Sequence, residues 1–363
     1  MTAPHGRRLL HLAAAVDQQS AYDAGSYVAL ARLAESGGLD FVTLDDSFAR
    51  PGPDALTVLS RVAPATHRVG LVPTVTTTHT EPFHVQARQL WDAWTPDGVS
   101  RPFAHRGQHF DIAGEFTVPR SPQGHPVVIQ AGDSDEGREF VAATADVIFT
   151  RHGTLKAGRA FYADVKRRLA KYGRGPDDLK IMPGVTVVLG DTAAEAQEKA
   201  GEMRKRQISP QNAMLALEQI WGVDLSAYDP DGPLPDLDPV PDAQLTQGRT
   251  RRGDTVALAE KWRALSKEKG LSIRQTVIEA SGRQSFIGTP EAVAAELDEF
   301  VQRDAADGFI LVPHLTPGGL DDFVDRVVPL LQERGAFRTE YQGVTLRSHL
   351  GLPAQPGMEG LIT

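Results

Sequence analysis

The chain of 363 residues contains no cysteine. Disulfide bonds, thiolate nucleophiles and cysteine-ligated zinc or iron–sulfur sites are therefore excluded. Acidic side chains outnumber basic ones, 47 to 38, and the net charge of −9 argues against broad binding to nucleic acid or to anionic membranes. The sequence has no HExxH-type cluster and no run of about 18 apolar residues, so we expect neither a metal site nor a transmembrane helix.

The first residues, MTAPHGRRLLHLAAAVD, place a basic pair before an apolar stretch, as a short signal peptide does. The polar residues Asp17, Gln18 and Gln19 that follow fit better with a first core strand that reaches an active-site edge. We therefore expect a cytoplasmic protein. An apolar content of 41% is ample for a large core.

Short apolar runs alternate with longer amphipathic segments along the chain. This alternation is typical of repeated β–α units around a parallel sheet. A polar and apolar mixture at 109–118 predicts a surface hairpin. A closed β/α barrel needs eight strands, and one is missing between the third predicted strand and residue 127. Seven runs are predicted as parallel strands: 9–16, 41–45, 69–76, 127–131, 146–150, 181–189 and 309–313.

Residues 203–283 interrupt this alternation. We interpret residues 1–363 as a single α/β domain in which 203–283 form a helical insertion. Within it the segment YDPDGPLPDLDPVPD, residues 228–242, has too many prolines and acids for regular structure and is expected to wander over the surface. The insertion is either a lid or partner arm, or a solvated linker without a role.

The segment PVVIQAGDSDEGREF, residues 126–140, joins an apolar strand to a helix through small residues. The first N–H groups of a helix have no intrahelical partner, and the helix dipole is positive there. A turn with Gly132, Ser134 and Gly137 at this point therefore suits a phosphate. The alternative is an ordinary capped helix, with Ser134 or Asp135 as its N-cap.

Polar residues also follow other predicted strands, where ligands bind in α/β folds. The second strand ends in LDDS (44–47), the third in TVTTT (74–78) followed by His79, and the last in VPH with His314. Carboxylates and hydroxyls around an apolar cavity can hydrogen-bond a polar heterocycle, and a histidine can transfer protons. Helix capping by the aspartates and plain β propensity of the threonines remain the alternatives.

Four stretches together resemble one family, the luciferase-like flavin-dependent monooxygenases, in the branch of the nitrilotriacetate and dibenzothiophene-sulfone enzymes. The resemblance implies a TIM-like (β/α)8 barrel of the bacterial luciferase type. It also implies an FMN-dependent monooxygenase that receives reduced FMN from a separate flavin reductase and oxygenates a small organic substrate with O2. The stretches are LDDSF at 44–48, TVTTTHTEPFHVQAR at 74–88, SPQGHPVVIQAGDSDEGREF at 121–140, and SFIGTPEAVAAELDEFV with DGFILVPHLTPGGLDDFVDRVVPLLQERG at 285–335.

The resemblance also implies roles for individual residues. Asp46 would meet the isoalloxazine ring, and Thr76 or Thr77 the ring or its ribityl chain. The phosphate would lie against the turn after the fourth apolar run. Its contacts would come from Gly132, Asp133, Ser134 and Gly137. His79 and His314 are candidate catalytic residues for a different reason, because they lie near the ends of predicted strands.

The chain departs from the family after residue 88. Family members continue with a fourth strand, a loop and a long helix, whereas here Gln89-Leu90 runs directly into WDAW at 91–94. Either the chain is naturally trimmed at this point or a segment of a longer protein is absent from it. Residues 82–94 are predicted to form a helix. In a trimmed chain either this helix or a second subunit would have to cover the bared strand edges, and we expect a homodimer. Two alternatives to the monooxygenase remain: a degenerate flavin-binding member without catalysis, and a deazaflavin-dependent hydride transferase.

Overall fold

The chain forms two compact units in the computed structural model, Met1–Val187 with Pro290–Thr363, and Val188–Thr289. The predicted insertion 203–283 lies inside the second unit. The interpretation of residues 1–363 as one domain with an insertion stays a prediction. The structure describes residues 6–17, 23–45, 52–75, 91, 93–94, 99–107, 111–115, 117, 121–152, 154–240, 255–280, 285–313 and 318–354.

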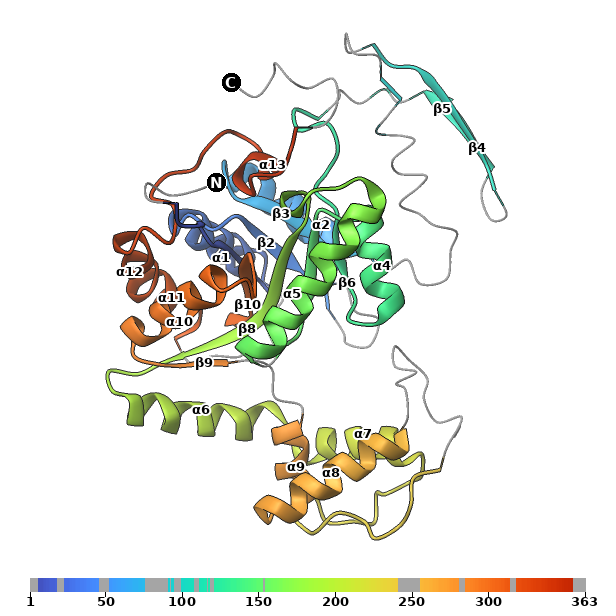
Figure 1. Ribbon diagram of the computed structural model, residues 1–363, viewed down its shortest axis with the longest axis vertical. Coiled ribbons are helices and arrows are strands. Elements are labelled where there is room, and N and C mark those ends of the chain that lie inside the picture. Colours follow the sequence, from blue (N-terminus) through green and yellow to red (C-terminus); the bar gives the residue numbers. More distant parts are fainter. Residues whose placement is uncertain are drawn as a thin grey trace. The chain divides into compact units, whose positions relative to one another are not determined.

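A parallel half-barrel forms the centre of the first unit (Figure 1). Its strands lie in the order β3-β2-β1-β10-β8-β7-β6, and each pairing along this path is parallel. The seven predicted strands are confirmed, and within the described ranges no strand joins β3 to β6. The bounds are β1 His11–Ala15, β2 Phe41–Leu44, β3 Gly70–Pro73, β6 Ile129–Ala131, β7 Val147–Thr150, β8 Lys180–Leu189 and β10 Gly308–Leu311.

Helices of the first unit pack in neighbouring pairs, α4 with α5, α11 with α12, and α1 with both α2 and α11. Asp23, Asp54, Ser134 and Thr154 each accept the N–H three residues further on, which sets the start of α1, α2, α4 and α5. No helix in the described part of the chain is both long and apolar enough to cross a membrane. The bounds are α1 Ala24–Ser36, α2 Ala55–Val62, α4 Asp135–Thr144, α5 Leu155–Leu169, α10 Pro290–Gln302, α11 Gly319–Arg326, α12 Val328–Glu333 and α13 Leu346–His349.

The inner face of the half-barrel is filled by side chains from its own strands and from the end of the chain. Leu350 and Leu352, which follow α13, are buried in this cluster, and Leu346 packs against it. The strand residues of the cluster come from β1, β2, β7, β8 and β10, namely Ala13, Phe41, Val147, Met182 and Ile310. Among the described residues, this apolar filling leaves no room for a polar site on the inner face. Ligands of parallel α/β sheets bind at the carboxyl edge of the strands, and we expect the site there.

Three aspartates tie the amino edge of the sheet together. Each comes directly before a strand, donates its N–H to a carbonyl of the neighbouring strand, and accepts that same residue's N–H on its carboxylate. Each aspartate therefore extends the ladder of strand hydrogen bonds by one reciprocal pair. The pairs are Asp40 with Leu12, Asp146 with Val128, and Asp307 with Ile181.

A cation balances each of these carboxylates. Asp146 binds Arg347 at 2.9 Å, Asp307 binds Lys166 at 2.8 Å, and Asp40 pairs with Arg338. Asp40 is fully buried, which by itself would raise its pKa, but Arg338 and His11 outweigh that effect and lower the pKa to about 2. The buried carboxylate is therefore charged at neutral pH.

The surface hairpin is longer than predicted. It pairs β4, Pro102–Arg106, with β5, Asp111–Glu115, in antiparallel register. The predicted range 109–118 holds only the second strand, so the prediction was wrong about where the hairpin begins. Proline can occupy the first position of an edge strand, and here Pro102 opens β4 within a sequence typical of a loop.

The second unit packs its helices around two tryptophans, Trp221 and Trp262, whose ring centroids lie 6.4 Å apart. β9, Ser285–Gly288, pairs with β8, whose last two residues belong to this unit. The helix bounds are α6 Ala193–Gln207, α7 Pro210–Trp221, α8 Thr255–Lys269 and α9 Ile273–Ala280.

The proline-rich segment of the second unit is irregular up to residue 240, as predicted, but it does not wander over the surface. Leu234 and Leu237 pack against the helical core, and the indole N–H of Trp221 donates to the carbonyl of Leu237 at 2.9 Å. Leucines between the prolines anchor the segment because a short extended stretch can bury an apolar side chain without regular hydrogen bonding.

Replacing Asp40 with Asn is expected to lower the free energy of unfolding at pH 7 by about 3 kcal/mol, because it leaves the Arg338 charge buried without its partner. The wild type has a depressed Asp40 pKa, so this contribution is present above about pH 4 and is lost as the pH falls toward 2. The difference in free energy of unfolding between variant and wild type, here called the gap, should therefore narrow by about 2 kcal/mol as the pH falls from about 4 toward 2.

Urea unfolding at a series of pH values measures this gap. Asp325→Asn is the control, because it removes the charge of an exposed aspartate on α11. A gap that stays constant from pH 6 to pH 3 contradicts the assignment of the acid-sensitive stability to Asp40.

Candidate functional site

The strand-to-helix turn between β6 and α4, residues 132–137, is called the elbow. Ser134 has extended backbone angles and its Oγ accepts the N–H of Gly137 at 3.0 Å, so it is the N-cap of α4. The capping interpretation of Ser134 is confirmed. In helix geometry the N–H groups of the next two residues, Asp135 and Glu136, have no intrahelical partner and remain donors for a ligand.

Two glycines let the backbone of the elbow close on itself. A Cβ atom on Gly132 would lie 3.4 Å from the Cα of Gly137. A Cβ atom on Gly137 would lie 3.2 Å from the Oγ of Ser134 and 3.3 Å from the Cα of Gly132. A side chain at Gly137 would therefore press on Ser134 and on the facing backbone, whereas one at Gly132 would make ordinary contact, and the two glycines leave bare backbone beside the helix start.

Asp133 and Ser134 are exposed, so side chains do not wall off the elbow. The carboxylate of Asp133 lies 3.9 Å from Nε of Arg151, which directly follows the last residue of β7. β7 is the neighbour of β6, so this arginine stands at the same carboxyl edge. The pair is loose and its side chains are 64% and 40% exposed, which leaves the guanidinium available to an anion.

His152 follows Arg151 and has a different environment. Its ring is buried, lies 5.6 Å from the Phe161 ring and has Nδ1 3.4 Å from the hydroxyl of Thr150. Burial lowers the pKa of His152, so its neutral form is favoured. Sequence reasoning missed both residues, although their position directly after an apolar run is the signal that selected the other strand ends.

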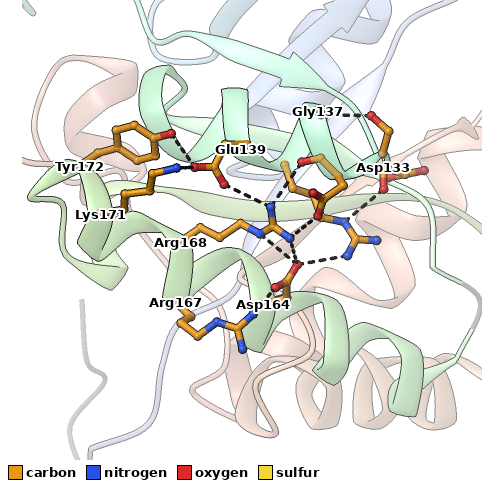
Figure 2. Close-up of polar contacts among 11 residues, drawn as sticks. Asp133, Gly137, Glu139, Asp164, Arg167, Arg168, Lys171 and Tyr172 are labelled. Atoms are coloured by element: carbon orange, nitrogen blue, oxygen red, sulfur yellow. Dashed lines mark hydrogen bonds and ion pairs between the residues drawn. The ribbon is translucent and has the colours of Figure 1, made fainter.

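Ion pairs fasten α4 to α5, as Figure 2 shows. Arg168 on α5 binds the carboxylates of Asp135 at 2.5 Å, Glu139 at 3.2 Å and Asp164 at 3.1 Å. Arg138 on α4 donates to the carbonyl of Asp133 and to Asp164, each at 3.1 Å. The first turn of α4 and the elbow are therefore held from the α5 side.

Glu139 contributes a second attachment to the same helix pair. Tyr172 donates to its carboxylate at 2.6 Å, and Lys171 pairs with the same oxygen. These hydrogen bonds lower the pKa of Glu139 to about 2, so it carries its negative charge at neutral pH. Asp135 and Glu139 on α4 are thus paired with Arg168 of α5, and Glu139 also with Lys171 just after it.

The structure brings together only part of the predicted site. Gly132, Asp133, Ser134 and Gly137 lie in the elbow, and Asp45 at the end of β2 donates its N–H to Asp17 at 3.3 Å. Their contacts with a cofactor stay predictions. The other predicted site residues lie outside the described ranges: Asp46, Thr76, Thr77, His79 and His314.

Known proteins resemble this chain along most of its length. The family described as luciferase-like monooxygenase matches residues 9–95 and 86–308. The chain is 36% identical to nitrilotriacetate monooxygenase component A of Aminobacter aminovorans, over 92% of this chain and 90% of that protein. It is 34% identical to N-acetyl-S-(2-succino)cysteine monooxygenase of Bacillus subtilis, over 89% and 88%.

The chain belongs to the luciferase-like monooxygenase family. Among solved structures, DmoA from Hyphomicrobium sulfonivorans superimposes with a TM-score of 0.74 at 22% identity, covering 97% of this chain and 93% of that one. The expected luciferase-type barrel fold and the expected monooxygenase class are both confirmed. Relatives with names of active enzymes do not favour the degenerate alternative.

The family match is interrupted where the sequence predicted a departure. Its two matching stretches overlap at residues 86–95, so the pattern ends and resumes there. The alignment with nitrilotriacetate monooxygenase component A has 422 positions, more than the 363 residues of this chain. That relative therefore has residues for which this chain has no counterpart, in agreement with the predicted loss of a strand and helix.

Replacing Ser134 with Ala is expected to lower the free energy of unfolding by about 1 kcal/mol, because the first turn of α4 loses its side-chain acceptor. Ser134→Asp should keep the wild-type stability, since aspartate is an equally good N-cap. Urea unfolding of the three proteins measures the difference. Equal stability of the Ala and Asp variants would show that the cap contributes nothing.

Proposed function

We propose that this luciferase-like monooxygenase binds FMN, receives it in reduced form from a separate flavin reductase, and oxygenates a small organic substrate with O2. The elbow carries the proposal. It combines a hydroxyl, free helix N–H groups and a glycine-lined backbone at the carboxyl edge of a parallel half-barrel, where ligands of such folds bind.

The residues of the elbow fit a phosphate monoester. The N–H groups of Asp135 and Glu136 and the hydroxyl of Ser134 are the donors, and a Cβ at Gly137 would crowd the cradle that they form. Arg151 stands within reach of the same edge and adds a cation. The Asp133 carboxylate would repel a phosphate, so we assign it the role of holding Arg151 rather than a direct contact.

The remaining roles extend the proposal along the carboxyl edge. Asp46 and either Thr76 or Thr77 would hydrogen-bond the flavin ring, and His79 or His314 would hold or move a proton beside it. When bound in reduced form, FMN supplies the electrons for reaction with O2. The chain's own residues bind and orient the flavin and exclude water from it.

Partners and assembly are part of the same proposal. A flavin reductase would supply reduced FMN, and a second copy of the chain would cover strand edges in a homodimer. β3 and β6 end the described sheet, and uncovered strand edges invite pairing. Sedimentation of the purified chain tests the dimer, and a monomer at micromolar concentration would contradict it.

The deazaflavin alternative has weaker support. Tetrahydromethanopterin reductase from Methanopyrus kandleri, named as coenzyme F420 dependent, has a TM-score of 0.55 at 12% identity, which is a likeness of fold alone. Three relatives between 34% and 36% identity carry monooxygenase names, those for nitrilotriacetate, N-acetyl-S-(2-succino)cysteine and dibenzothiophene sulfone. The same relatives are the reason for preferring an active enzyme to a degenerate flavin-binding protein.

Ser134 variants should bind FMN in the order wild type, Ala, Asp, from tightest to weakest. Ser134→Ala loses one hydrogen bond to a charged group and should weaken FMN binding by about 1–2 kcal/mol. Ser134→Asp keeps the cap and adds a repelling charge, so it should bind less tightly still. This order differs from that expected for stability, where Asp equals the wild type.

Fluorescence titration with FMN and with riboflavin measures the effect. Riboflavin has no phosphate, so its dissociation constant should be the same for all three proteins. An FMN dissociation constant that Ser134→Ala leaves unchanged would remove this serine from the phosphate site.

Reduced FMN mixed with excess protein should be reoxidised by O2 with a time course different from that of free reduced FMN. A monooxygenase controls this reaction, whereas a degenerate member that binds no reduced flavin leaves it unchanged. Stopped-flow absorbance with a chemically reduced flavin measures the time course without a reductase. A trace identical to that of free reduced FMN supports the degenerate alternative.

A further inference from the structure

The start of α4 carries more negative charge than a phosphate site ordinarily tolerates. Asp135 and Glu136 occupy its first turn, Asp133 precedes the cap, and Glu139 follows one turn later. Acids in the first turn suit the helix dipole, but they oppose a phosphate dianion at the same helix end. A phosphate can bind at the elbow only if these charges are compensated or directed away.

Arg168 is placed to do this for two of these acids at once. Its guanidinium contacts Asp135, Glu139 and Asp164, and it also donates to the main-chain carbonyl of Asp135 at 3.4 Å. The Arg168 side chain is only 18% exposed, although it belongs to a helix surface. Figure 2 shows it between α4 and α5, with the acids gathered around it.

We propose that Arg168 is a positioning residue for the flavin phosphate. It holds the carboxylates of Asp135, Glu139 and Asp164 on the α5 side of α4 and offsets part of their charge, so that the N–H groups at the start of α4 meet the phosphate with less opposing charge. The inference rests on the proposed function, because it assigns a supporting residue to the same elbow.

The adjacent arginine provides a matched control. Arg167 lies on the same helix and binds Asp164 at 2.6 Å, but its side chain is 78% exposed, and this ion pair lies within α5. Arg167→Gln and Arg168→Gln remove the same charge from neighbouring positions. A general effect of net charge on FMN binding would therefore appear in both variants, and a positioning effect only in Arg168→Gln.

Titration of the full chain with FMN and with riboflavin tests the proposal. Arg168→Gln should raise the FMN dissociation constant about tenfold, the size expected for a partly screened carboxylate facing a dianion, and less so at high salt. The riboflavin dissociation constant should change by less than about twofold, because that ligand has no charge to repel. Arg167→Gln should leave both constants close to the wild-type values.

A rescue experiment separates charge compensation from a purely structural role. The double variant Arg168→Gln with Asp135→Asn removes the nearest uncompensated carboxylate and should regain a substantial part of the lost FMN affinity. A structural defect in α4 would not be repaired by losing a further ion pair. An FMN dissociation constant that the second substitution leaves unchanged or raises overturns the proposal.

Asp135→Asn alone covers the case in which Arg168→Gln does not fold, because Asp135 is 79% exposed and tolerates substitution. It should tighten FMN binding about twofold, since one carboxylate is removed from the helix end that meets the phosphate while Arg168 keeps its charge. Unchanged or weaker FMN binding by this variant contradicts the proposal.

The titrations distinguish a failure of the phosphate site from a failure of the role of Arg168. If the wild type binds FMN and riboflavin with equal affinity, the phosphate site of the proposed function is wrong. If the wild type prefers FMN and Arg168→Gln keeps the same preference, the phosphate site stands and the role of Arg168 is wrong.

Discussion

Three reciprocal pairs of hydrogen bonds hold the amino edge of the parallel sheet. In each pair the carboxylate of an aspartate accepts the N–H that a strand carbonyl would otherwise accept. Asp40, Asp146 and Asp307 accept a neighbouring strand's N–H on a carboxylate, and a carboxylate accepts more strongly than a peptide carbonyl. A buried charge of this kind requires a cation, and two of the three cations, Arg338 and Arg347, come from the last part of the described chain. Residues 338–352 are thus part of the same compact unit as the sheet.

The two edges of the sheet are built on opposite electrostatic principles. At the amino edge the carboxylates have close partners, and leucines after residue 345 fill the interior behind them. At the carboxyl edge the elbow keeps unpaired helix N–H groups, and Asp133 and Arg151 meet only at 3.9 Å. Tight pairs give stability because they are satisfied within the protein, whereas loose and exposed groups retain the capacity to bind a ligand.

The sequence predicted the seven strands because buried parallel strands are continuous apolar runs, which need no knowledge of the fold to recognise. It also predicted the elbow, where glycine, serine and helix start adjoin along the chain. It could not predict contacts between distant segments. Arg347 and Asp146 form an ion pair although they are 201 positions apart in the sequence. The indole N–H of Trp221 donates to the Leu237 carbonyl, which lies in an irregular segment. Arg168 was missed for this reason, since its role arises only when α5 packs on α4.

The family match is interrupted near residues 86–95, and the proposed flavin site has parts on both sides of this point. The two parts depend to different degrees on the residues that this chain lacks. The elbow, α4 and α5 all lie within the second matching stretch, and their mutual ion pairs need nothing from the lost strand. The proposed ring contacts, Asp46 and Thr76 or Thr77, lie within the first stretch, just before the interruption. Phosphate binding can therefore persist whether or not the ring is held in a productive position. For this chain, affinity for FMN and control of its reaction with oxygen are separate properties, and the first does not establish the second.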